Sequence, residues 1–317
     1  MMCVVIFIIF ALTSLSNVDP GRMKLGPEAT DEQVAAINAS FGLDKPMIVR
    51  YFRFLGGILK GDLGQSWYRD EPVIVQIQAR WPYTIKLTLL SIGIAIIIGI
   101  PIGVLAAVKQ YSFADRFFTI LSMIIAAIPT FCMATLFVLA FSVKLGWVPA
   151  SGVSQGWKNW ILPSVTLGTH YAASFIRFTR SSMLDTIRQD YIRTVRAKGV
   201  KESKVIWGHA FRNALLPLIT ITGTMLGGLL GGAVIMESVF VIPGLGTLVQ
   251  QGINQHDVPV VVGSITILAT VFMLIMLVVD ILYAVVDPRI RAKYQAGSKK
   301  KKKAKAAPAV KTEGGAA

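Results

Sequence analysis

The chain alternates between long apolar runs and shorter polar segments. Six runs carry no charged residue: Met1–Val18, Leu87–Val108, Phe117–Val143, Asn159–Ile176, Asn213–Met236 and Val258–Val279. A helix rises ~1.5 Å per residue and a bilayer core is ~30 Å thick, so about 20 apolar residues are needed for one crossing. This pattern predicts an all-α polytopic membrane protein with about six transmembrane helices.

The first run is the weakest of the six, because it is short and no basic residue precedes it. A cleaved signal peptide is a competing interpretation. Residues 17–21 nevertheless read Asn-Val-Asp-Pro-Gly, which indicates a helix stop rather than a small-residue cleavage site. We therefore expect residues 1–18 to form a first transmembrane helix, which can be incomplete.

Composition supports membrane residence. Hydrophobic residues make up 54% of the chain and charged residues 15%, whereas soluble domains carry roughly 25% charged residues. The two cysteines, Cys3 and Cys132, lie in apolar runs without metal-ligand spacing, so we interpret them as small apolar fillers.

The net charge of +15 is distributed in a way that predicts orientation. Nine Lys or Arg residues lie between Arg177 and Arg212, and ten lie between Arg289 and Lys311. The eight basic residues between Arg22 and Arg80 are matched by eight acidic ones in segment 19–80. Basic loops remain cytoplasmic, so we expect both termini in the cytoplasm of a multi-pass protein of the cell (inner or plasma) membrane.

The excess charge does not indicate nucleic-acid binding, because it is spread over several inner segments and a lysine-rich tail. Residues 289–317 are rich in Ala, Lys and Pro, which predicts a disordered cytoplasmic tail that anionic membrane lipid can attract. A tail without a specific role is an equally open interpretation.

Residues 19–80 predict a structured extracytoplasmic segment. Short helices are expected at Asp31–Asn38 and Met47–Leu59, followed by a turn-rich break at Gly61–Ser66. The segment is too long for a passive connection. A cap over a pore and a docking surface for a partner are both open.

Residues 81–288 are expected to hold a five-helix transmembrane core, interrupted by a charged cytoplasmic loop at 177–213. Two short amphipathic helices, Asp190–Lys198 and Glu202–Asn213, are predicted there, with Gly199 between them. Such helices can fill a groove in another protein or lie flat on a membrane. Periodicity alone leaves both readings open.

The residues of this loop carry a specific resemblance. Residues 191–199 read Tyr-Ile-Arg-Thr-Val-Arg-Ala-Lys-Gly, and residues 209–217 read His-Ala-Phe-Arg-Asn-Ala-Leu-Leu-Pro. Together they resemble the coupling loop of permease subunits from ATP-binding-cassette (ABC) importers, in the oligopeptide/dipeptide/nickel subfamily. Apolar segments between about residues 15 and 292 match as well, among them Gly57–Ser66 and Glu237–Gly246. Lys201 departs from the pattern, since relatives often place a helix-capping serine there.

The resemblance implies the type I ABC importer permease fold and a loop that fits a cleft on a nucleotide-binding subunit. The residues expected to act in coupling are Arg193, Arg196, Ala197, Lys198, Gly199, Glu202, Trp207, His209, Phe211, Arg212 and Pro217. Gly199 permits a turn that a Cβ obstructs. Trp207 and Phe211, one turn apart, can form an apolar anchor, and the basic side chains can pair with acidic groups on the partner.

The resemblance also places a gate or docking surface on the outer side. Its candidate residues are Asp62, Gly64, Glu237, Pro243, Gly244 and Gly246. Candidates for helix packing or the pore are Pro129, Gly223, Gly227 and Gly231. The glycines recur every four residues, which permits close helix contact within this chain or a sliding interface with a second subunit.

Several function classes lack their sequence signals. There is no G-x-x-x-x-G-K-[ST] phosphate loop and no metalloprotease or hydrolase motif, so we expect no catalysis, metal or cofactor in this chain. His170 is the one ionisable residue well inside a predicted span, which argues against an ion-coupled carrier.

The expected partners are a second homologous permease, two cytoplasmic ATP-binding subunits, an extracytoplasmic solute-binding protein and membrane lipid, without nucleic acid. Peptides are the first expected cargo, with nickel chelates, glutathione or oligosaccharides as alternatives. A stand-alone carrier or channel, and a non-transporting membrane anchor or sensor, are the remaining alternatives.

Overall fold

The computed structural model describes residues 2–14 and 19–286, and the regular structure in these residues is helical apart from one isolated bridge between Gln65 and Pro72. The helices are α1 (Met2–Ser14), α2 (Pro20–Leu25), α3 (Asp31–Ser40), α4 (Met47–Leu59), α5 (Val73–Val108), α6 (Phe113–Ala127), α7 (Thr130–Phe137), α8 (Ile161–Ile187), α9 (Asp190–Ala197), α10 (Glu202–Lys204), α11 (Phe211–Val239), α12 (Leu245–Asn254) and α13 (Val258–Val286). The predicted basic tail, 289–317, lies outside the described residues.

Three shorter helical segments of other types complete the fold. A π-helical segment, Val138–Lys144, continues α7, and a 3₁₀ turn, Gly156–Trp160, precedes α8. A second π-helical segment, Val205–Ala210, joins α10 to α11.

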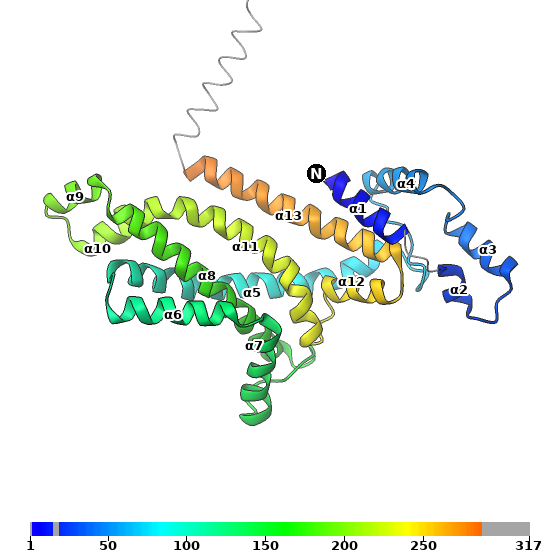
Figure 1. The fold of residues 1–317 in the computed structure, drawn as a ribbon, viewed down its shortest axis with the longest axis horizontal. Coiled ribbons are helices and arrows are strands. Elements are labelled where there is room, and N and C mark those ends of the chain that lie inside the picture. The colour runs from blue at the N-terminus through cyan, green and yellow to red at the C-terminus, as the bar shows by residue number, and fades with distance from the viewer. Residues whose placement is uncertain (1, 15–18, 287–317) are drawn as a thin grey trace, which may run out of the picture.

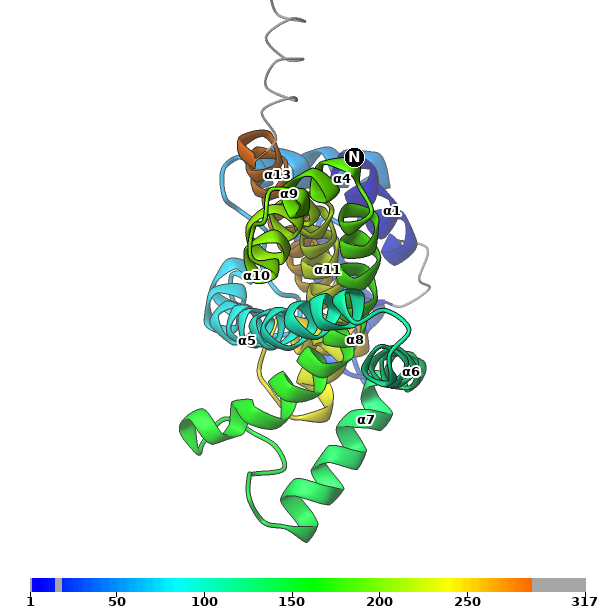
Figure 2. The same cartoon turned by 90° about the vertical axis from the view of Figure 1, so that its left-hand side faces the viewer.

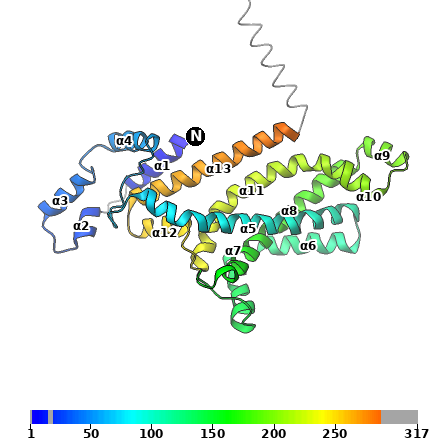
Figure 3. The ribbon, with the colours of Figure 1, turned by 180° about the vertical axis from the view of Figure 1, so that it is seen from behind.

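The long helices lie side by side along the long axis of the molecule (Figures 1 and 3). Helices α9 and α10 stand at one end, and α2, α3 and α4 stand at the other. Viewed along that axis, α8 and α11 lie among the other long helices, and α7 projects sideways (Figure 2). This arrangement separates the predicted cytoplasmic loop from the predicted outer segment.

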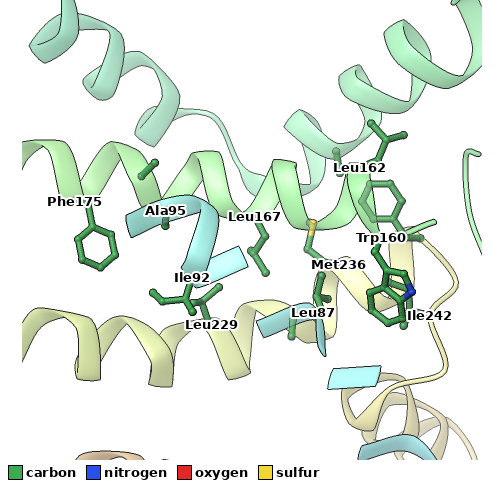
Figure 4. Packing of buried hydrophobic residues seen from close by; sticks show 14 residues of the cluster. Leu87, Ile92, Ala95, Trp160, Leu162, Leu167, Phe175, Leu229, Met236 and Ile242 are labelled. Carbon is green, nitrogen blue, oxygen red and sulfur yellow. The ribbon is translucent and has the colours of Figure 1, made fainter. Parts of the chain in front are cut away.

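The main core lies where α5, α8 and α11 meet (Figure 4). Leu87 of α5, Leu167 and Phe175 of α8, and Leu229 and Met236 of α11 are fully buried there. Burying a side chain of this size contributes roughly 1.5–3 kcal/mol. These contacts hold the three helices that connect the two ends of the molecule.

Within the described residues, the predicted spans fall on helical segments, but these segments differ in length and in apolar composition. Among the described residues, three helices are long and apolar enough to cross a membrane: Val73–Val108, the continuous Glu202–Val239, and Val258–Leu282. The apolar part of α1, Cys3–Leu12, is shorter. Helix α8, with 27 residues, is long enough, but it carries polar side chains along its length.

The third predicted span, Phe117–Val143, is wrong as a single helix. Its two halves, Phe113–Ala127 and Thr130–Lys144, meet at an angle of 100°. The residue before a proline is disfavoured in the helical region, and Ile128, before Pro129, is extended with ψ of 124°. The proline at position 129 thus marks a bend, and the two halves count as a fourth span only if they cross together.

Two helices begin or end away from the segment boundaries suggested by the sequence. Helix α5 begins at Val73 after Pro72, so the boundary at residue 80 falls inside a helix. The predicted second loop helix, Glu202–Asn213, does not end near Asn213 but runs on into α11. No proline stands between Lys204 and Phe211, and the helix continues through Gly208 in the π-helical segment Val205–Ala210.

In the outer segment, the two predicted helices are confirmed. Thr30 and Gln33 form a reciprocal capping box at the start of α3, which explains why that helix begins there. Helix α4 begins directly after Pro46 and packs on α1, where the Tyr51 hydroxyl donates to the Cys3 carbonyl at 2.9 Å.

Candidate functional site

The predicted coupling loop begins with α9, which is anchored to the helix bundle by the apolar side chains of Ile192 and Val195. Ile192 is fully buried and packs with Val104 of α5, Met183 of α8 and Ile206. The polar face of α9 is exposed, with 79% of the Arg193 side chain accessible. The loop is therefore a fixed projection whose charged face is open to a partner.

Gly199 forms the joint between α9 and α10. Its φ of +74° lies in the left-handed region, and a Cβ built on it would meet nothing within 4 Å. The requirement for glycine here is one of backbone conformation rather than of space.

An ion pair spans this joint. Arg196 Nη2 donates to Glu202 Oε1 at 2.6 Å, and Nε donates to Oε2 at 3.1 Å. The hydrogen bonds to Glu202 raise the pKa of the Arg196 guanidinium above its usual value. Arg196 is thus paired inside the loop, which corrects the expectation that it is available for an acidic group on a partner.

The other predicted coupling residues separate into two groups. Trp207 and Phe211 meet edge to face with centroids 5.2 Å apart, and Trp207 is 49% exposed. The two rings thus lie together, and their role as an anchor for a partner stays a prediction. Ala197, Lys198 and Arg212 are exposed and His209 is half-buried. Pro217 does not belong to the projection, because it lies inside α11 beyond Phe211.

The glycines of α11 favour packing within this chain at two of the three predicted positions. A Cβ on Gly223 would lie 2.6 Å from Val279 Cγ2, and a Cβ on Gly227 would overlap the Phe272 ring, both on α13. A Cβ on Gly231 would meet nothing within 4 Å. Gly231 thus lies on an open face and not in this helix contact.

That open face of α11 carries mainly small or hydroxyl-bearing side chains, together with the large apolar Ile235. Its exposed positions recur every three or four residues and are Asn213, Pro217, Thr220, Thr224, Gly228, Gly231 and Ile235. Lipid-facing positions of a spanning helix are normally apolar, and small or hydroxyl-bearing positions favour a protein partner or an aqueous path. The stripe therefore indicates the side of α11 that faces away from lipid.

At the C-terminal end of α11, Glu237 is fully buried and joins three helices. Its Oε1 accepts from the Thr84 hydroxyl of α5 at 2.5 Å, and its Oε2 accepts from the Thr247 backbone N–H of α12 at 3.0 Å. The Leu245 N–H donates to Thr84 Oγ1 at 2.8 Å. The carboxylate thereby caps the N-terminus of α12, where a negative charge is favoured.

Helix α12 lies between the last two predicted spans, in a stretch where the sequence analysis predicted no helix. The turn before it holds the predicted Pro243 and Gly244, whereas the predicted Gly246 lies in its first turn. A Cβ on Gly246 would lie 2.5 Å from the Val234 Cα. The close approach explains why small residues stand where the chain turns back on α11.

Asp62 and Gly64 lie in the turn that precedes α5. Asp62 Oδ1 accepts from the Gly64 N–H at 2.8 Å, and Gly64 has a φ of +83°. Leu63 between them is buried against Leu245 and Leu248 of α12. The structure therefore brings these two predicted outer residues next to the α12 turn, whereas Pro129 stands apart at the bend between α6 and α7.

The sequence analysis did not identify two buried carboxylates that join distant segments of the chain, Asp257 and Asp115. Asp257 is 1% exposed and accepts from the Ser66 hydroxyl and from the Trp67 N–H at 3.2 Å, which joins the outer segment to α13. Asp115 is 3% exposed and accepts from Arg180 Nε at 2.5 Å and Nη2 at 2.9 Å, which joins α6 to α8. The available signal was an acidic residue at the edge of a long apolar run.

No group of three or more His, Cys, Asp or Glu residues able to hold a metal ion occurs in the part of the chain that the structure describes. The site's features are thus structural and electrostatic: a charged projection at one end, a capped hairpin at the other, and a polar helix face between them. These features define a helical membrane protein with a charged projection at one end.

Comparison with known proteins gives the family. Residues 99–292 match the family described as "Binding-protein-dependent transport system inner membrane component", and residues 1–88 match its N-terminal family, "Binding-prot-dependent transport system membrane comp, N-term". The chain belongs to this family, within its oligopeptide/dipeptide/nickel permease branch, and is a permease of an ABC importer.

Similar proteins from several bacteria carry one and the same name. The glutathione transport system permease protein GsiC of Salmonella paratyphi A is 40% identical over 290 residues, covering 92% of this chain and 94% of the relative. GsiC of Pectobacterium atrosepticum shows the same identity and coverage, and GsiC of Escherichia coli K12 is 39% identical over 294 residues.

A solved structure gives the fold. An inward-facing form of the MetNI methionine ABC transporter superposes with a TM-score of 0.59 at 20% identity, covering 68% of this chain and 97% of the other. The expected all-α, type I ABC importer permease fold is thereby confirmed.

Proposed function

We propose that this chain forms half of the translocation pore of an importer for glutathione and related short peptides. The other components are a second homologous permease, two cytoplasmic ATP-binding subunits and an extracytoplasmic solute-binding protein. The substrate proposal is supported by the relatives, which are named for glutathione transport. Nickel chelates and oligosaccharides remain alternatives within the same branch.

The observation that carries the coupling mechanism is the projection at residues 190–211. It is held to the bundle through Ile192 and Ile206, while Arg193 and Trp207 are exposed. The chain has no phosphate loop of its own. A rigid, exposed projection allows an ATPase that closes on ATP to move α8 and α11 together, and the pore then changes the side to which it opens.

Orientation follows from the same geometry. The α9–α10 end carries the basic loop, and basic loops stay cytoplasmic. The outer segment at the opposite end, with the α12 hairpin, then faces the solute-binding protein. Because coupling between two binding sites is reciprocal, docking outside changes the ATP affinity of the ATPases inside.

Reconstitution tests the function. The complete complex in proteoliposomes is expected to accumulate labelled glutathione only with ATP and the loaded binding protein, whereas the permease alone does not. Uptake by the single chain without ATP would contradict the proposal in favour of a stand-alone carrier.

A crosslinking experiment tests the projection separately. A photoreactive residue at Trp207 is expected to capture an ATP-binding subunit, and one at Phe52, an exposed residue of α4, is not. Protease or cysteine-labelling access to residues 190–204 from the outside of intact cells would contradict the orientation.

A further inference from the structure

A cavity of about 440 Å³ opens beside the end of α11. Its polar lining comes from Arg80 of α5, from Glu237 and Ser238 of α11, and from Thr247, Gln250, Gln251 and Asn254 of α12. Ligand pockets have volumes of about 300–1,000 Å³ and few convergent polar groups. The cavity therefore has the size and lining of a small-molecule site.

Arg80 is half-buried at this cavity without an acidic partner. Its Nη2 donates to Gln251 Oε1 at 2.9 Å and its Nη1 to Thr247 Oγ1 at 3.5 Å. No carboxylate of residues 2–14 and 19–286 lies within ion-pair distance of it. A partly desolvated charge without a counter-ion is unfavourable, and an anion in the cavity relieves this cost.

The nearby acid does not neutralise Arg80 directly. Both oxygens of Glu237 already accept hydrogen bonds, from the Thr84 hydroxyl and the Thr247 N–H. Arg69, on the turn before α5, interacts unfavourably with Arg80, and Glu237 interacts favourably with it without forming an ion pair. Arg80 is the cation that lines this cavity.

The cavity also continues the polar face of α11. Ser238 and Val241 line it, and Ile235 and Gly231 follow on the same exposed side of the helix. A solute held here stands at the outer end of the stripe that faces away from lipid. This placement favours an entry site over a site on the lipid-facing surface.

We propose that this cavity binds a carboxylate of the transported solute, with the Arg80 guanidinium as its anion-binding group; the inference rests on the proposed import of short peptides. A guanidinium holds a carboxylate through two parallel N–H···O bonds. The Gln250 amide, whose oxygen accepts from the Ser238 hydroxyl at 2.6 Å, keeps its NH₂ group for a further hydrogen bond. Glutathione and every peptide with a free C-terminus offer such a carboxylate.

Chemical protection tests the site without requiring transport. The purified importer complex is treated with phenylglyoxal, and modification of each arginine is followed by mass spectrometry. Glutathione is expected to slow modification of Arg80 at least threefold, whereas its dimethyl ester, which lacks both carboxylates, is not. The exposed Arg193 is the internal reference and is expected to react at the same rate with either probe. Equal protection by acid and ester, or none by either, overturns the proposal.

Transport by variants gives the second measurement. Arg80→Gln is expected to lower glutathione uptake about tenfold, equivalent to ~1.4 kcal/mol, and Arg80→Lys to recover part of it because the charge remains. Lys60→Gln, an exposed cation in the same outer segment, is the matched control with wild-type uptake. Uptake by Arg80→Gln within twofold of wild type overturns the site. If wild-type complex shows no ATP-dependent uptake but glutathione protects Arg80, the proposed function fails and the site stands.

Discussion

The Glu237 carboxylate occupies the space that a side chain at Gly244 would need. A Cβ built on Gly244 would overlap the carboxyl carbon and both oxygens of Glu237. Glu237 belongs to α11, and Gly244 is the N-cap of α12, so this contact fixes the turn between the two helices. The φ of Gly244 is −98°, which any residue adopts, so the demand here is for space.

This contact predicts that Gly244→Ala is destabilising. Overpacking in a buried site costs typically about 1–3 kcal/mol, so we expect a lower midpoint of thermal unfolding in detergent and loss of transport. Gly231→Ala is the matched control, because a Cβ there meets nothing within 4 Å. An unfolding midpoint for Gly244→Ala equal to that of Gly231→Ala would show that the turn can relax.

Thr84 predicts a second effect at the same turn. Its hydroxyl donates to Glu237 and accepts from the Leu245 N–H, so Thr84→Val leaves two buried groups without a partner. Each unsatisfied buried group costs about 1–3 kcal/mol, and we expect the unfolding midpoint to fall clearly.

Thr224→Val is the control for Thr84→Val. Thr224 is exposed on α11, and its hydroxyl bonds only to carbonyls of its own helix, Thr220 and Ile221. We expect this variant to stay close to wild type. Equal losses in the two variants would contradict a special role for the Thr84 hydroxyl.

The Asp115–Arg180 pair predicts strong coupling between α6 and α8. Removing one member of a buried pair costs about 3–5 kcal/mol, because the other charge stays without a partner. Here Arg180 is partly exposed, with 26% of its side chain accessible, so we expect the lower end of that range.

A double-mutant cycle of Asp115→Asn and Arg180→Gln measures the pair. We expect an interaction energy above about 1 kcal/mol, obtained from unfolding in a mixed-micelle denaturant series. The exposed pair Arg22–Asp31 is the control, since such surface pairs contribute about 0–1 kcal/mol. Additive effects at Asp115 and Arg180 would show that the contact does not hold the helices together.

Several elements could be predicted from the local sequence pattern alone. Helices α3 and α4 follow from helical spacing, from the capping residue Thr30 and from Pro46, and the Gly199 joint follows from a glycine between two amphipathic segments. These signals lie within a few residues of the element they define, so one sequence is enough to read them.

Tertiary contacts decided the features that the sequence did not reveal. Helix α12 was missed because glycine and proline at 243–246 indicate a loop, whereas the buried Glu237 caps a helix there. Asp115 and Arg180 are separated by 65 residues, and Ser66 and Asp257 by 191. Periodicity carries no information about such pairings. Arg80 likewise read as one of eight outer basic residues until the fold placed it at a cavity.

The joint at Gly199 gives the last prediction, which concerns coupling rather than stability. A left-handed backbone costs a residue with a Cβ roughly 1–2 kcal/mol, most for β-branched residues and least for asparagine. No atom lies within 4 Å of the Cβ position, so steric overlap does not contribute. Gly199→Val is therefore expected to shift α9 relative to α10 and to reduce transport per ATP hydrolysed, whereas Gly199→Asn stays near wild type.

Two measurements separate this effect from loss of the protein. Membrane insertion and the unfolding midpoint of Gly199→Val are expected to change little, because Ile192 and Ile206 still anchor the loop to the bundle. Co-purification of the ATP-binding subunits, or the ratio of transport to ATP hydrolysis, is expected to fall. If Gly199→Val keeps wild-type values of both, the projection does not need a fixed angle at this joint. In that case the ATP-binding subunit contacts α9 alone, and Trp207 is not needed for its binding.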